Sequence, residues 1–315
     1  MYELQVWGIE GEISVISPEC LASAWLLSEK FGEEFVIIPS NNTNYSEIGR
    51  LPVLIDDITK KKYQGFEEIA GLIGFEPDDL ELELFNQSLI KLLLNEFEIL
   101  NQFNLYINTK NYSNYTIKLF KNYLPFPMMY NQPLKFRTYA QNMVQILGLH
   151  GNKRGLFNFT NSSVATTDTE NIDETDDDGD ETSQVALTGL HEKQLLKKSK
   201  QRNLLQESKN SFKCLNILNT ELNSILEMYK KYPSLENNTN KYLLHAYLFC
   251  FMNKDLPDQF IKNTLFSKNQ SFMETVVEES NNRNEKLKSY FSSPKIHQIP
   301  SLLNEIKYIT GFIKY

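Results

Sequence analysis

Short alternating patterns of hydrophobic and polar residues mark the first eighty positions. Residues 3–7 alternate in character and residues 34–38 hold a run of β-branched side chains, so each predicts a short strand. A third strand is predicted at 51–55 and a fourth at 61–63, on either side of an Asp-Asp turn. These four segments predict a small sheet at the start of the chain.

Two helices are predicted among these strands. Ser17-Pro18-Glu19 supplies an N-cap, a proline at the first helical position and an acid in the first turn, and Gly32 ends the helix that follows. A second helix is predicted at 67–73, after the fourth strand. The order is therefore strand, helix, strand, strand, strand, helix.

From residue 78 onward the apolar residues recur every three or four positions, which is typical of helices with one buried side. The first such series is Leu82, Phe85, Leu89, Leu92, Leu93, Phe97, Leu100 and Phe103. Further helices are predicted at 114–124, from Pro133 to Leu147, and at 215–229, 242–252 and 302–309. The second half of the chain is therefore expected to be a helical bundle.

Two stretches of this helical half bear on membrane contact. Residues 242–252 are the most apolar, yet they are much shorter than the roughly 20 residues that span a bilayer as a helix. The last stretch, 296–315, is amphipathic. We expect it to close the helical bundle, and the alternative is that it lies against a partner or a membrane surface.

Residues 151–190 interrupt the helical pattern. They hold few large aliphatic side chains and a dense series of acids from Asp168 to Glu181. Such a segment cannot offset its ordering entropy by burial, so an acidic disordered insertion is expected here. We interpret it and the basic run at 193–202 as a solvated linker and a solvated helix face. The alternative is that the acids meet basic partner proteins while the lysines approach anionic lipid headgroups.

Charge and composition exclude several classes of protein. The formal net charge of −8 argues against a general nucleic-acid binder, because phosphate recognition depends on clustered Lys and Arg. Cys20, Cys214 and Cys250 form no C-x-x-C pair and the four histidines are scattered, so no metal site and no cofactor is predicted. The N-terminus runs directly into strand-like sequence, so no cleaved import signal is expected.

The order of elements, with an L-P-V-L run opening the third strand, resembles the thioredoxin-like domain of glutathione transferases. The resemblance implies a fold of class α/β plus all-α, with a thioredoxin-like domain at 1–76. A helical domain would follow at 77–150 and resume at 191–315 after the insertion. Pro52 would be a cis-proline whose missing N–H leaves the adjacent backbone free to pair with a peptide-like ligand. The alternative is a proline in a surface turn.

Glutathione transferases activate a thiol with a Tyr, Ser or Cys near the start of the first helix. The candidates here are Ser14, Ser17 and Cys20, but Ser17 is explained as a helix cap and Cys20 as a packing residue. Where transferases anchor glutathione with an acid or Gln followed by Ser, this chain has Gly65-Phe66, which removes those polar groups. No catalytic residue is therefore predicted, and a glutathione-dependent enzyme is the alternative.

Several blocks of sequence are similar to the metaxin family, and in particular to its larger members in the fungal mitochondrial sorting and assembly machinery. They are Val6-Trp7-Gly8, Ser40–Thr43 followed by Leu51–Ile55, Gly65-Phe66, and above all Asn108–Tyr112 with its continuation to Leu134. A weaker match lies at Leu244–Phe249. The resemblance marks Trp7, Pro52, Gly65 and Phe66 as residues that determine the fold.

The resemblance to metaxins also implies a function and a location. It implies a non-catalytic peripheral subunit on the cytosolic face of the mitochondrial outer membrane, which supports the insertion, assembly and release of β-barrel precursors. The expected partners are the barrel-forming core subunit, a second metaxin-like subunit, the outer-membrane translocase and the precursors themselves, with peripheral contact to the membrane.

A break between two predicted helices, at Phe126-Pro127-Met128-Met129-Tyr130, concentrates large and rigid side chains. One interpretation is a loop tucked onto the core. The other is a protruding hydrophobic contact for a partner, since aromatic and Met side chains are enriched at protein interfaces. These five residues are the candidate partner-binding residues.

Overall fold

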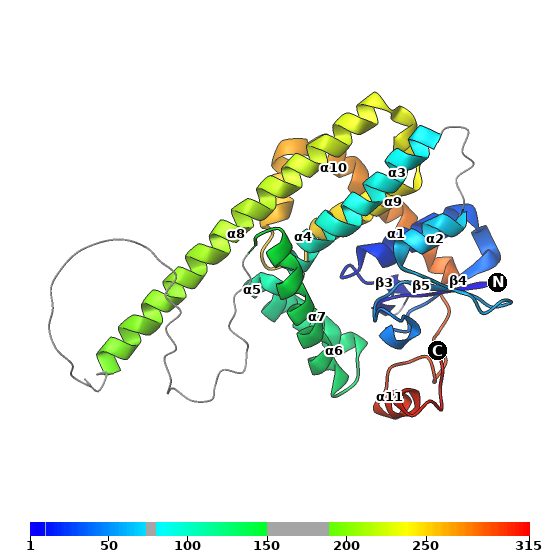
Figure 1. The fold of residues 1–315 in the computed structure, drawn as a ribbon, viewed down its shortest axis with the longest axis horizontal. Helices are drawn as coiled ribbons and strands as arrows, with labels where there is room; N and C mark the ends of the chain where they lie inside the picture. The colour runs from blue at the N-terminus through cyan, green and yellow to red at the C-terminus, as the bar shows by residue number, and fades with distance from the viewer. Residues whose placement is uncertain (10, 74–79, 150–188) are drawn as a thin grey trace.

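The computed structural model describes residues 1–9, 11–73, 80–149 and 189–315, and it begins with a four-stranded sheet (Figure 1). The strands are β1 (Tyr2–Gln5), β4 (Phe35–Ile38), β5 (Val53–Asp56) and β6 (Lys62–Gln64), in the spatial order β4-β1-β5-β6. β1 pairs in parallel with β4 and antiparallel with β5, and β5 pairs antiparallel with β6. The four predicted strands are confirmed as one mixed sheet.

The middle of the sheet contributes directly to the core. Leu4 on β1 lies opposite Ile37 on β4 and opposite Leu54 on β5, and all three side chains are fully buried. A small hairpin of β2 (Gly8–Ile9) and β3 (Glu12–Ile13), which the sequence pattern did not predict, follows β1. The Leu51-Pro52 bond just before β5 is cis, as the resemblance implied, and Phe126-Pro127 is also cis.

Helices make up most of the rest of the described chain. They include α1 (Pro18–Lys30), α2 (Gly65–Ile73), α3 (Leu80–Leu92), α4 (Glu98–Gln102), α5 (Thr109–Asn111), α6 (Ile117–Tyr123), α7 (Met128–Ile146), α8 (Gly189–Lys231), α9 (Thr239–Phe251), α10 (Phe260–Leu287) and α11 (Leu302–Ile309). Three π-helical turns, at 93–97, 103–107 and 112–116, join α3 to α6. Within the described residues, no helix is both long and apolar enough to cross a membrane.

Helix α1 joins β1 to its parallel neighbour β4 and lies at the centre of the molecule (Figure 1). Its residues from Cys20 to Leu27 are all buried, because the helix packs against α2, α9 and α10 as well as beside the sheet. The Trp25 ring lies 6.2 Å from that of Phe249 on α9, and its Nε1 donates a 2.8 Å hydrogen bond to Asn284 Oδ1 on α10. The sheet and the helices therefore share one core.

A network of buried asparagines explains the block of sequence at 108–112. Asn108 Oδ1 accepts hydrogen bonds from the backbone N–H groups that open α5, and Asn108 Nδ2 donates to Asp258 Oδ2 at 2.9 Å. Asn111 is fully buried, donates to Asn104 Oδ1 at 2.9 Å and accepts from the Asp258 N–H at 2.8 Å. Buried amides must be paired, so this network holds the end of the π-helical segment against the loop before α10.

Two sequence-based boundaries are corrected by the structure. Helix α7 begins at Met128, and Pro133, which was expected to start it, lies buried inside it. A proline inside a helix removes one backbone hydrogen bond, and α7 accommodates that loss. The expected disordered insertion at 151–190 lies outside the described residues except for its last two positions, which open α8. The basic run at 193–202 lies within α8.

The end of the chain returns to the sheet. The Ser292 N–H donates to the Ile37 carbonyl at 2.9 Å on the outer edge of β4, and the Tyr290 ring stacks on Phe35 at 4.9 Å. Helix α11 therefore lies beside the N-terminal part, at the bottom of Figure 1, and does not close the helical bundle as expected. The amphipathic pattern was identified correctly, but such a pattern does not specify which neighbour the helix meets.

Candidate functional site: a filled ligand position and an exposed apolar side

The fold-determining residues Pro52, Gly65 and Phe66 come together where α2 begins. The Gly65 N–H donates to the Pro52 carbonyl at 2.9 Å, and the Phe66 N–H donates to Glu19 Oε2 at 3.0 Å. Gly65 has a φ of +74°, a conformation that favours glycine, and an added Cβ would lie 3.3 Å from the Glu19 carboxylate. The Phe66 side chain is fully buried. This pair thus closes the start of α2 onto α1.

Behind Phe66 lies a pair of largely buried carboxyl groups. Burial, the neighbouring charge of Glu98 and the more distant charge of Glu67 raise the pKa of Glu19 to about 7, against the opposing hydrogen bond from Phe66. Burial also raises the pKa of Glu98, which accepts a hydrogen bond from the Tyr247 hydroxyl at 3.1 Å. Sequence reasoning missed this pair, because its members lie far apart in the chain and no spacing signal joins them.

The cavity at this position is small. It measures about 40 Å³ and its walls include Trp7, Ser17, Glu19, Arg50 and Glu98. That volume holds about one water molecule, whereas ligand sites for small molecules are roughly 300–1,000 Å³. The space beside Glu19 and Glu98 is therefore filled by the chain's own side chains.

The three candidate nucleophiles differ in their surroundings: Ser17 is half-buried and lines this small cavity, and Ser14 lines a separate, larger one. Cys20 is fully buried, and burial raises the pKa of its thiol to about 12, so the thiol stays protonated at neutral pH. Ser17 occupies the predicted N-cap position, yet its Oγ donates to the Leu51 carbonyl at 3.4 Å and does not cap the helix. Ser14 is buried and its Oγ accepts from the Ile16 N–H at 3.3 Å.

Trp7 joins the sheet to the helical part. Its ring is buried and makes edge-on contacts with Phe120 on α6 at 5.5 Å and with Phe136 on α7 at 6.1 Å. The next residue, Gly8, pairs with Asn41, whose side chain exchanges two 2.9 Å hydrogen bonds with the Gly8 backbone. The first two blocks of the family resemblance are thus packed against each other, and Trp7 also contacts Phe120 in the continuation of the Asn108–Tyr112 block.

The candidate partner-binding residues divide into a buried and an exposed set. Met128 and Met129 pack in part against the core. Phe126 and Tyr130 are 70% and 46% exposed, and their rings contact each other edge-on at 6.3 Å. The methionines of this segment therefore pack onto the core, while its two aromatic rings protrude into solvent.

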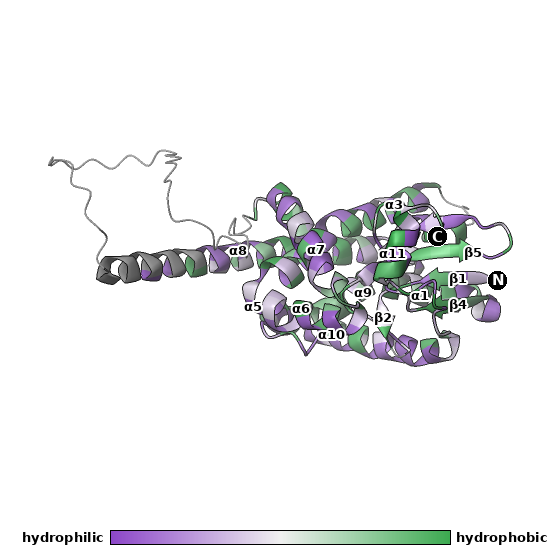
Figure 2. Cartoon of the chain, turned by 90° about the horizontal axis from the view of Figure 1, so that it is seen from below, coloured by the Kyte–Doolittle hydropathy of each residue, from purple (hydrophilic) through white to green (hydrophobic). Residues whose placement is uncertain are grey.

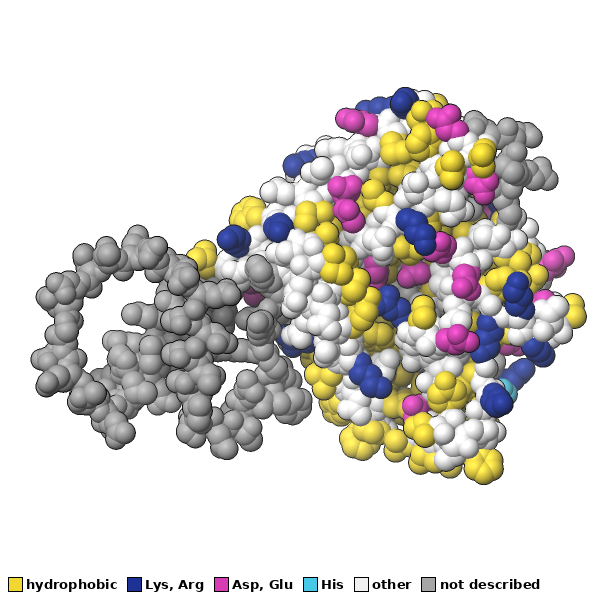
Figure 3. Space-filling model, in the orientation of Figure 1, with side chains coloured by type: hydrophobic (Ala, Val, Ile, Leu, Met, Phe, Trp, Pro, Cys, Tyr) yellow, Lys and Arg dark blue, Asp and Glu magenta, His cyan; other side chains and the backbone are white. Residues whose placement is uncertain are grey.

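A groove of about 460 Å³ separates this turn from α11. Pro127, Met128 and Asn131 line one side, and Pro300 and Leu302 line the other. Figure 3 shows hydrophobic side chains along the lower edge of the molecule, where Figure 1 places α11 and the α6–α7 turn. In Figure 2, α11 faces the viewer and is coloured largely hydrophobic. The two segments thus lie on one side of the molecule.

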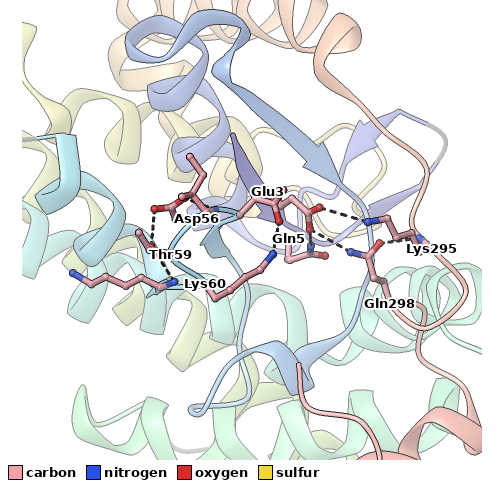
Figure 4. A network of polar contacts seen from close by, with 10 residues as sticks. Glu3, Gln5, Asp56, Thr59, Lys60, Lys295 and Gln298 are labelled. Atoms are coloured by element: carbon pink, nitrogen blue, oxygen red, sulfur yellow. Dashed lines mark hydrogen bonds and ion pairs between the residues drawn. The ribbon is translucent and has the colours of Figure 1, made fainter.

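Polar contacts fasten the segment before α11 to β1 of the sheet (Figure 4). The Glu3 carboxylate on β1 accepts from Gln5 Nε2 and from Gln298 Nε2, each at 3.4 Å, and lies 3.9 Å from Lys295 Nζ. Gln298 also accepts from the Lys295 N–H at 2.8 Å, and its carbonyl accepts from Asn42 Nδ2 at 3.2 Å. These contacts tie the C-terminal segment to residues of the N-terminal part.

A larger cavity of about 960 Å³ opens between the β2–β3 hairpin, α6 and α10. Its walls combine apolar residues, such as Leu119 and Phe266, with both acids and lysines, such as Glu278 and Lys262. Among the described residues, no group of three or more His, Cys, Asp or Glu side chains is placed to hold a metal ion.

Two family models match the chain. One, described as an outer mitochondrial membrane transport complex protein, matches residues 20–137. The other, described as the Tom37 C-terminal domain, matches residues 166–312. Together they take in most of α1, the start of α2 at Gly65-Phe66, the α6–α7 turn and α11. No curated protein matches the chain.

Proposed function

Because this chain belongs to the Tom37 family of outer mitochondrial membrane transport complex proteins, we propose that it is a non-catalytic subunit of the machinery that sorts and assembles β-barrel proteins. The observation that carries the proposal is the family match, which takes in most of the chain and agrees with the metaxin resemblance of its sequence blocks. The subunit would support the insertion, assembly and release of β-barrel precursors.

The proposed architecture is a glutathione-transferase-like fold. It is supported by the sheet order β4-β1-β5-β6, the cis bond before Pro52 and the central position of α1 between the sheet and the helices. We propose the domain division of the sequence analysis: a thioredoxin-like domain at 1–76, and a helical domain at 77–150 and 191–315. The acidic segment at 151–190 would be an insertion in the helical domain.

The proposal that the subunit lacks catalysis rests on the filled ligand position. A cavity of about 40 Å³ leaves no space for a tripeptide thiol, and Gly65-Phe66 offers no side-chain polar group to its charged end. The Cys20 thiol is buried, with a pKa of about 12. Among the three candidate nucleophiles, Cys20 is therefore inaccessible, whereas Ser14 lines the cavity of about 960 Å³ and is the candidate that the assay below tests.

The proposed partners are the barrel-forming core subunit, a second metaxin-like subunit, the outer-membrane translocase and β-barrel precursors. The subunit would bind them peripherally, on the cytosolic face of the outer membrane. The protruding rings of Phe126 and Tyr130 are the proposed protein contact, because large aromatic side chains anchor many interfaces.

Co-purification from mitochondria tests this proposal. The tagged full chain should bring down the barrel-forming subunit from detergent-solubilised mitochondria, and Phe126→Ala with Tyr130→Ala should weaken that recovery at unchanged protein level. The exposed Ile58→Ala, on the β5–β6 turn, is the matched control. A chain that does not fractionate with mitochondria, or that conjugates glutathione to electrophiles in a manner abolished by Ser14→Ala, would overturn the proposal.

A further inference from the structure

Helix α11 is attached to the protein through its polar side. Its one buried residue, Asn304, donates from Nδ2 to the carbonyls of Ile296 and Ile299 at 3.0 and 2.8 Å. Glu305 accepts a 2.7 Å hydrogen bond from Asn44 of the N-terminal part. Two polar residues of this amphipathic helix, Asn304 and Glu305, are thus turned away from water.

The residues after α11 fix this orientation from the other end. The Tyr315 ring lies 4.8 Å from that of Tyr45 and 5.5 Å from that of Tyr308, on the inner side of α11. The Tyr315 carbonyl also accepts a hydrogen bond from Lys62 Nζ on β6. Turning the helix over would break these contacts together with those of Asn304 and Glu305, so the orientation is held at both ends.

The opposite side of α11 is apolar and exposed. It carries Leu302, Leu303, Ile306 and Ile309, and Phe312 follows just after the helix. The exposed fractions of these side chains rise from 51% at Leu302 to 85% at Phe312. The spacing of the four residues within α11 places them on one side of the helix. Contiguous exposed apolar surface of this kind marks a site that something else covers.

Charge around the stripe favours a lipid surface over a protein. Lys307 follows Leu303 by one helical turn and Lys314 follows Phe312, and both are exposed and outside the ion pairs of the described residues. Glu305, the acid of this helix, is turned toward Asn44. Lysine is depleted at protein interfaces, whereas lysines beside an apolar stripe reach the anionic headgroups of a membrane.

We propose that α11 and Phe312 form a membrane-surface contact, with the apolar stripe in the headgroup region of an anionic bilayer and the two lysines at its phosphates. Eight residues of helix extend about 12 Å, much less than the roughly 30 Å of a hydrocarbon core, so the helix lies in the surface. The inference rests on the proposed function in placing the chain at the outer membrane. It also puts Phe126 and Tyr130, across the groove, on the membrane-facing side.

Vesicle flotation with the purified full chain tests this proposal. Vesicles of phosphatidylcholine with about one-fifth phosphatidylinositol should carry the chain to the top of the gradient, and pure phosphatidylcholine vesicles should carry less. Ile306→Glu with Ile309→Glu should lower the bound fraction at least about tenfold, because charges would replace two aliphatic side chains that are proposed to be buried in the bilayer. Lys307→Ala should weaken binding to the anionic vesicles alone, by roughly fivefold.

Two controls keep the test specific. Ile58→Glu changes an equally exposed isoleucine on the β5–β6 turn and should bind vesicles like the unchanged chain. Circular dichroism should show the same helix content in every variant, because the substituted side chains are exposed.

The outcomes separate this inference from the proposed function. Equal flotation of the Ile306→Glu, Ile309→Glu variant and the unchanged chain would overturn the membrane contact. The membrane contact would also be overturned if the unchanged chain did not bind vesicles and the same two substitutions abolished co-purification of the barrel-forming subunit. In that case α11 would be a protein interface. A chain that binds vesicles through α11 yet never co-purifies with that subunit would sustain the membrane contact and contradict the proposed function.

Discussion

At the scale of single residues, the start of α2 is held by groups of the chain itself. The Phe66 N–H donates its hydrogen bond to the Glu19 carboxylate. Glu19 in turn lies near a second buried acid, Glu98, which contributes to its raised pKa. An ionised carboxylate is costly in such surroundings, so this arrangement favours the protonated acid.

The raised pKa of Glu19 predicts how stability depends on pH. An acid with a higher pKa in the folded state binds its proton more tightly there than in the unfolded state. Its contribution to the stability of the fold is therefore complete below about pH 4.5 and is lost as the pH rises through about 7. Glu19→Gln keeps an acceptor for Phe66 and removes the charge. At pH 8 its free energy of unfolding should therefore exceed that of the unchanged chain by at most about 3 kcal/mol. At pH 4.5 the two proteins should differ little.

The measurement is urea unfolding of both proteins at the two pH values, with the exposed Glu33→Gln as control. A Glu19→Gln variant whose stability changes with pH as much as that of the unchanged chain would show that Glu19 does not titrate in this range.

Gly65 gives a second prediction at this scale. Its positive φ and the nearby Glu19 carboxylate predict that Gly65→Ala destabilises the fold by about 1–2 kcal/mol. Gly71, in the same helix, has open space around it and an ordinary helical conformation. Gly71→Ala should therefore be neutral or stabilise by up to about 1 kcal/mol. Thermal unfolding of the two variants compares them directly, and equal effects would contradict the role given to Gly65.

At the scale of elements, the Asn108–Tyr112 block of the family resemblance holds two parts of the fold together. Asn111 ties the π-helical segment to the loop at Asp258, and it is fully buried. Asn111→Ala should therefore destabilise the fold by about 2–4 kcal/mol, because it leaves buried amide partners unpaired. The exposed Asn114→Ala, in the next π-helical turn, should change stability by less than about 0.5 kcal/mol. Denaturant midpoints that fall equally for both would contradict this account.

The elements that were predicted correctly are those set by local pattern. The four strands, α1 and the cis bond at Pro52 follow from alternation, helix-start residues and the resemblance. The predicted start of α7 was wrong because Pro133 lies buried inside the helix and does not begin it. The β2–β3 hairpin was missed because its strands are only two residues long and carry almost no pattern.

The candidate site was less predictable than the fold. Gly65-Phe66 could be identified because the resemblance assigns that position a ligand role. The Glu19–Glu98 pair could not, because its members lie far apart in the chain and only the folded structure brings both to the wall of one small cavity. Similarly, periodicity identified the apolar stripe of α11, but the side that meets the protein is decided by contacts such as that of Glu305 with Asn44.

At the scale of the whole molecule, one core joins the sheet and the helices, and one side carries the exposed apolar segments. Trp25 and Trp7 connect the sheet region with α9, α10, α6 and α7. The α6–α7 turn and α11 protrude from it on a common side (Figure 3). This arrangement suits a subunit that contributes surface to a membrane machinery.

Assembly of an imported β-barrel precursor in mitochondria that lack this chain tests the central claim most directly. The account predicts slow assembly, restored by the unchanged chain and equally by Ser14→Ala or Cys20→Ala at matched protein level. Normal assembly without the chain would contradict the account. So would a failure of the Ser14→Ala or Cys20→Ala variant to restore assembly while it still folds and binds the barrel-forming subunit.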